Sequence, residues 1–83
     1  MKTADRRNEI IAAANRYSQL AIDEGTNAAA KSFYTDYFNG VWTCNEHTIL
    51  IPLIQWYINC KCGVMTRGEC KRRQNDILKH LEE

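Results

Sequence analysis

The stretch TCNEHTILIPLIQWYINC occupies residues 43–60 and contains the longest apolar run of the chain. Thr43 and Glu46 have the spacing of a capping box, which predicts that a helix begins near Cys44. From residue 53 to residue 60 the segment is apolar nearly all round, as is typical of a helix that is buried on every side. We therefore expect residues 53–60 to be the central and most buried element of the fold.

Two features of the same stretch oppose a helix that begins so early. Pro52 lacks a backbone N–H and favours either a later helix start or a kink. Residues 41–51 are also rich in β-branched side chains, which are common in strands. A short extended segment over residues 41–51 is therefore the alternative to the early helix.

Three further helices are predicted around this stretch. The first has Thr3 as its N-cap and runs to about Glu24, the second runs over about residues 28–38, and the last begins at the capping box of Thr66 and Glu69. Apolar side chains recur at helical spacing in the first two of these segments: Ile10, Ala13, Ala14, Tyr17, Leu20 and Ala21 in the first, and Ala30, Phe33, Tyr34, Tyr37 and Phe38 in the second. The sequence predicts a single all-α domain over residues 1–83, a compact bundle of about four helices with a C-terminal helical hairpin.

Composition and charge exclude several classes of protein. Hydrophobic residues make up 45% of the chain and charged residues 25%, which is typical of folded domains and not of disordered chains. The net charge of +1 commits the chain neither to nucleic acid nor to an anionic membrane. No signal peptide is recognised at the N-terminus, and the apolar run at residues 49–58 is about half a membrane span. We expect a cytoplasmic protein with no membrane association, whose cysteines are reduced thiols.

The C-terminal part of the sequence carries a pattern made of Gly63, Val64, Met65, Thr66, Glu69, Lys71, Ile77 and Leu78. Through these residues the segment 63–79 resembles the turn and second helix of the short C-terminal domain (SHOCT-like) family. The chain departs from that family at Cys70, where an aromatic residue usually follows the glutamate. The resemblance implies a helical hairpin that mediates self-association or partner binding.

The cysteines are the residues whose side chains are best suited to binding a metal ion. Cys60, Cys62 and Cys70 flank the predicted turn and are the alternative ligand set for a zinc ion. Cys44, followed by His47, lies about 24 Å from Cys60 if the intervening residues are helical, so it cannot share that ion. The expectation is that no metal or other cofactor is bound and that Cys60 and Cys70 behave as small hydrophobic residues.

No arrangement of residues in the sequence predicts an enzyme. A cysteine–histidine pair would also need an orienting group and an oxyanion hole, and the sequence has no phosphate-binding loop or metalloprotease motif. We therefore expect no catalytic residues. His47, near a helix start, is expected to be a surface residue.

Basic residues near the start of the last helix favour one alternative function. Arg67, Lys71, Arg72 and Arg73 place four cations on a predicted helix over residues 67–82, which makes a small DNA- or RNA-binding regulator the alternative. Acidic residues interleave with these cations, however, and a solvated basic face is the more common explanation.

The apolar residues exceed what a core of this size can bury. We expect the remainder to form a surface patch at Tyr34, Phe38 and Trp42, where a protein partner or a second copy in a homodimer binds. The predicted function is that of a small non-enzymatic protein that binds a macromolecular partner. An accessory regulator or inhibitor, of the kind that phages and mobile elements encode, has this size and character.

Overall fold

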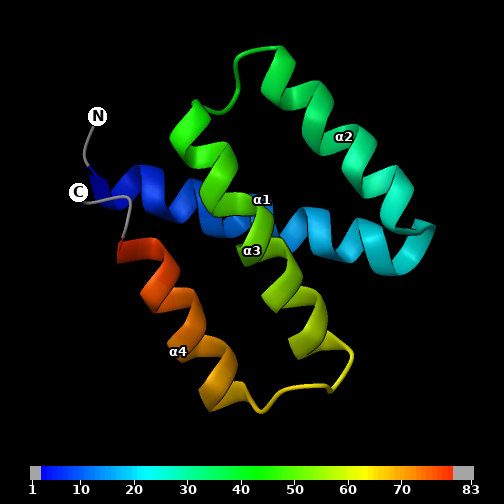
Figure 1. Ribbon diagram of the computed structural model, residues 1–83, viewed down its shortest axis with the longest axis vertical. Coiled ribbons are helices and arrows are strands. Elements are labelled where there is room, and N and C mark those ends of the chain that lie inside the picture. Colours follow the sequence, from blue (N-terminus) through cyan, green and yellow to red (C-terminus); the bar gives the residue numbers. More distant parts are fainter. Residues whose placement is uncertain (1–2, 80–83) are drawn as a thin grey trace.

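The computed structural model describes residues 3–79, with side chains from Asp5 to Lys79, and every regular element in that range is a helix. The helices are α1 (Thr3–Glu24), α2 (Thr26–Phe38), α3 (Cys44–Lys61) and α4 (Arg67–Leu78). The predicted all-α fold of four helices is thus confirmed, and the antiparallel pair of α3 and α4 forms the predicted C-terminal hairpin (Figure 1).

Local chemistry explains where the helices begin and end. Gly25 alone connects α1 to α2, and its φ of 102° is a conformation that glycine adopts without steric cost. At α3 the capping box is complete, because the Glu46 N–H donates to Thr43 Oγ1 (3.1 Å) and the Thr43 N–H donates to Glu46 Oε1 (2.9 Å). At α4, Thr66 Oγ1 accepts from the Glu69 N–H (3.3 Å). The two capping boxes in the sequence therefore mark real helix starts.

α1 is the helix on which the fold is assembled. Both α2 and α3 pack mainly against α1, whereas α4 packs mainly against α3 (Figure 1). The buried core combines the predicted stripe of α1 with residues from the other helices: Ile10, Ala13, Ala14, Tyr17, Phe33, Trp42, Leu50, Leu53 and Leu78. The far end of α3 is tied to α1 by the Lys61 ammonium, which donates to the Asn15 carbonyl (3.1 Å).

Three expectations about burial and backbone are corrected. The extended alternative over residues 41–51 is wrong from Cys44 onward, because the capping box starts the helix there and Pro52 lies inside it. Residues 53–60 are not the most buried part, since Leu53 is buried but residues 54–60 are half-buried or exposed. In α2 the alanine that faces the core is Ala29, and Ala30 is exposed. The reason is the open arrangement of the helices, in which α2 and α3 pack more closely on α1 than on each other.

Candidate functional site

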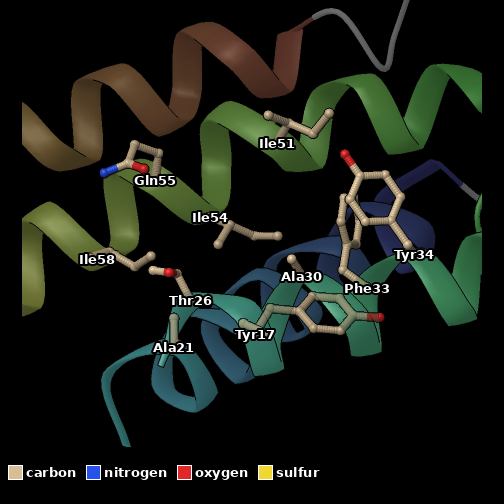
Figure 2. A pocket seen from close by; sticks show the side chains of 11 residues that line it. Tyr17, Ala21, Thr26, Ala30, Phe33, Tyr34, Ile51, Ile54, Gln55 and Ile58 are labelled. Carbon is tan, nitrogen blue, oxygen red and sulfur yellow. The ribbon is translucent and has the colours of Figure 1, made fainter. Parts of the chain in front are cut away.

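A partly open apolar groove lies between α2 and α3, with α1 beneath it, and encloses about 200 Å³ (Figure 2). Small residues of α2 such as Thr26 and Ala30 face Ile54 and Ile58 of α3 across the groove. The full lining is Tyr17, Ala21, Thr26, Ala29, Ala30, Phe33, Tyr34, Ile51, Ile54, Gln55 and Ile58. The groove remains unfilled because the small side chains at this end of α2 do not reach α3.

The rim of the groove is uncharged. Exposed side chains continue from the groove onto the surface, and we call them together the α2–α3 face: Thr26, Ala30, Tyr34 and Phe38 of α2, with Ile51 and Gln55 of α3. Phe38 is 80% exposed, and Ile51 and Tyr34 are 49% and 45% exposed. In the sequence between Asp36 and Lys61 the only Asp, Glu, Lys or Arg is Glu46, which is buried. No exposed Asp, Glu, Lys or Arg side chain is therefore present among residues 37–60.

Polar contacts of the partly exposed Arg6 and the buried Glu46 hold the start of α3 against α1. The Arg6 guanidinium donates to both carboxylate oxygens of Glu46, at 2.5 Å and 2.6 Å, and also to the carbonyl of Val41 at 2.8 Å. The same guanidinium lies 5.0 Å from the centre of the Trp42 ring. The Arg6 guanidinium holds the pKa of Glu46 below its ordinary range, and Glu46 correspondingly raises the pKa of Arg6. The ion pair and the capping box share the Glu46 carboxylate. Glu46 therefore fixes both the residue at which α3 begins and the position of that end of α3 against α1.

The predicted surface patch of Tyr34, Phe38 and Trp42 is only partly at the surface. Tyr34 and Phe38 are exposed, but Trp42 is 6% exposed and belongs to the core. Its indole N–H donates to the hydroxyl of Tyr17 at 3.1 Å, and that hydroxyl in turn donates to Asp36. The expectation that Trp42 lies on the patch is therefore wrong, because a hydrogen-bond acceptor on α1 satisfies its N–H inside the protein. Ile51, which belongs to the apolar run at residues 49–58, is exposed as well.

His47 is not the surface residue that its position suggested. Its ring stacks on Phe33 at 4.6 Å and on Tyr37 at 4.1 Å between ring centres, and Tyr34 is 5.3 Å away. Its buried Nδ1 has no hydrogen-bond partner among the residues that the structure describes. No local signal predicts this stacking, because Phe33 and Tyr37 lie on another helix. These ring contacts join the first turn of α3 to α2.

The four cations of the nucleic-acid alternative do not form one surface. Arg67, Lys71 and Arg72 are exposed on α4. Arg73 instead packs its guanidinium 4.8 Å above the Trp56 ring and pairs with the Glu69 carboxylate at 3.2 Å. Three cations therefore remain for contact with phosphates, and Arg73 serves to attach α4 to α3.

The cysteines of the zinc alternative differ in burial, although the Cys60 and Cys70 thiols lie next to each other. Cys62 is exposed, Cys60 is half-buried, and Cys70 is buried with its thiol donating to the Trp56 carbonyl at 3.2 Å. Burial raises the pKa of the Cys70 thiol, which disfavours the thiolate that a metal needs. Among the residues that the structure describes, no three His, Cys, Asp or Glu side chains are grouped so as to hold a metal ion. The zinc alternative therefore has no ligand set in residues 5–79.

None of the helices formed by residues 3–79 is long and apolar enough to cross a membrane. Comparisons of the chain with protein-family models, with curated proteins and with solved structures found no match. A function for the groove can therefore be inferred only from the residues that line it.

Proposed function

We propose that this chain is a non-enzymatic helical protein that acts by binding a protein partner through the α2–α3 face. The observation that carries the proposal is an apolar groove whose lining, which includes the exposed Tyr34 and Ile51, contains no charged side chain, with the exposed Phe38 one turn beyond Tyr34 on α2. The cores of protein interfaces are depleted in charged residues and enriched in aromatic ones, and the same is true here. A small binding protein of this kind fits an accessory regulator or inhibitor, as phages and mobile elements encode.

The energetics favour a protein partner over a charged ligand. Covering the exposed parts of Phe38, Tyr34 and Ile51 would contribute about 4 kcal/mol in total, and no ionic group of the face would lose its water. Gln55 and Thr26 provide polar groups at the rim that orient a partner without the desolvation cost of a charge. An amphipathic helix that lays its apolar side into the groove is the mode of recognition that such a surface favours.

The test compares two substitutions of exposed aliphatic residues by glutamate. Ile51→Glu introduces a charge beside the groove, whereas Val64→Glu introduces the same charge at a 72% exposed residue in the α3–α4 turn. A partner captured from extracts of the native host and then purified should bind Ile51→Glu at least about tenfold more weakly than wild type, a loss of about 1.4 kcal/mol. Binding of Val64→Glu should stay within about twofold of wild type.

Helical circular dichroism of both variants shows whether they remain folded. A folded Ile51→Glu variant that binds the purified partner as tightly as wild type would contradict the proposal. Equal weakening by Ile51→Glu and Val64→Glu would contradict it as well, because the effect would then not depend on the α2–α3 face.

A further inference from the structure

The exposed stripe of α2 has an ordered sequence of side-chain sizes. Thr26, Ala30, Tyr34 and Phe38 follow one another at a spacing of four residues, and all of them are exposed. Residues four apart lie on the same face of a helix. Along α2 the stripe therefore presents two small side chains and then two large aromatic ones.

This order is self-complementary when two copies of α2 meet in antiparallel orientation. A twofold axis that passes the midpoint of the stripe brings Phe38 opposite Thr26 of the second copy and Tyr34 opposite Ala30. Each large side chain then faces a small one, and the contact repeats itself across the axis, as an isologous interface requires. A parallel pairing would instead place Phe38 against Phe38 and would leave the small residues apart.

The groove offers space where the antiparallel pairing needs it. Thr26 lies at the end of the groove that Ala21 and Ile58 also line, whereas Tyr34 and Ile51 lie at the other end (Figure 2). A Phe38 ring that arrives opposite Thr26 would therefore meet small and aliphatic side chains. The charged residues of α2, Lys31 and Asp36, do not belong to the stripe.

We propose that the occupant of the α2–α3 groove is a second copy of this chain, with the two α2 helices antiparallel and Phe38 of each copy at the small-residue end of the other's groove. The inference rests on the proposed function of the α2–α3 face as a protein interface. It adds the identity of one partner and the register in which that partner binds.

The size of the face sets the expected strength of the dimer. The 13 residues of α2 extend about 20 Å, and two helices side by side are about 20 Å wide, which gives a footprint of about 400 Å² per copy. Stable interfaces usually bury about 800 Å² per partner, so the dimer belongs to the weak and reversible class. We expect dissociation in the micromolar range.

Sedimentation equilibrium of the full chain, from about 1 μM to about 1 mM, tests the proposal directly. The mass should rise from 9.6 kDa to about twice that value, and the dissociation constant of Phe38→Glu should increase at least about tenfold. Val64→Glu is the matched control and should dimerise like wild type. A wild-type chain that stays monomeric at about 1 mM, or a Phe38→Glu variant that dimerises normally, would overturn the proposal.

An exchange of side chains tests the antiparallel register. Phe38→Thr alone places Thr opposite Thr, and Thr26→Phe alone places Phe opposite Phe, so each single variant should dimerise at least about tenfold more weakly. The double variant with both changes restores Phe opposite Thr and should recover most of the wild-type affinity. No recovery in a folded double variant would refute the antiparallel register.

The failures of the two proposals are distinguishable. A monomeric wild-type chain whose captured partner still depends on Ile51 would overturn the dimer and leave the proposed function standing. A dimer with the predicted side-chain dependence, together with a captured partner that binds Ile51→Glu normally, would mean that this partner uses another surface. The proposed function would then fail for that partner while the dimer stands.

Discussion

Removing the charge of Glu46 should destabilise the fold, because this carboxylate is the buried partner of Arg6. Glu46 is 8% exposed and accepts two charge-assisted hydrogen bonds from the Arg6 guanidinium. Glutamine is also accepted at this position of a capping box, so Glu46→Gln removes the charge and keeps the cap. Breaking a fully buried ion pair costs about 3–5 kcal/mol. Since Arg6 is partly exposed and keeps its bonds to Glu9 and Val41, we expect a loss of about 2 kcal/mol.

Urea denaturation followed by circular dichroism measures this loss. In a domain of this size, about 2 kcal/mol corresponds to a decrease in Tm of about 10 °C. Glu9→Gln is the matched control, because Glu9 pairs with the same guanidinium at 2.7 Å but is exposed to solvent. That control should cost no more than about 0.5 kcal/mol. Equal losses in the two variants would refute the reasoning, since burial of Glu46 would then make no difference.

The effect of Glu46→Gln should also depend on pH. The Arg6 guanidinium lowers the pKa of Glu46 in the folded state, so the folded protein binds fewer protons at this site than the unfolded chain. The stabilisation by Glu46 is therefore complete above the ordinary carboxyl pKa and is lost as the pH falls through the lowered value. We expect the difference between wild type and Glu46→Gln to shrink between about pH 5 and about pH 2. A difference that is constant over this range would show that the ion pair is not its source.

Three other predictions concern the core, the basic helix and the cysteines. Trp42→Phe removes the indole donor to the Tyr17 hydroxyl and should cost about 2 kcal/mol in urea denaturation; an unchanged midpoint would contradict the buried position of Trp42. Binding to duplex DNA should be weak, salt-sensitive and indifferent to sequence, and the double variant Arg67→Ala/Lys71→Ala should weaken it equally for all sequences. Tight, sequence-selective binding at physiological salt would instead favour the nucleic-acid alternative. The purified reduced protein should hold less than about one zinc per chain by elemental analysis, and stoichiometric zinc that is lost in Cys62→Ser would contradict this.

The helices were predictable because their signals are local. Thr43 and Thr66 act on backbone groups three residues away, and Gly25 ends α1 by its own conformation. The core stripe of α1 follows from helical periodicity and needs no knowledge of its neighbours. Signals of this kind involve only residues that are close together in the sequence. The number of helices and most of their ends could therefore be predicted.

The candidate site was less predictable because it depends on contacts between distant residues. Trp42 is buried because Tyr17, 25 residues away, accepts its N–H, and Glu46 is buried because Arg6 lies opposite it. The exposure of Ile51 depends on the distance between α2 and α3, which no periodicity determines. Tyr34 and Phe38 could be placed at the surface, but the groove beside them could be seen only in the assembled fold.

The position of α4 has a consequence for how the molecule tolerates change. α4 lies on the side of α3 that faces away from α2, and it is anchored mainly by Cys70, Leu78 and the stacking of Arg73 on Trp56 (Figure 1). An element attached to one neighbour opens more readily than one packed on several, so amide hydrogens of α4 should exchange earlier than those of α1. Such local opening leaves the walls of the groove in place. The exposed positions of the C-terminal helix can thus change in sequence, or the helix can carry a fused label, while the proposed binding surface on the opposite side of α3 is preserved.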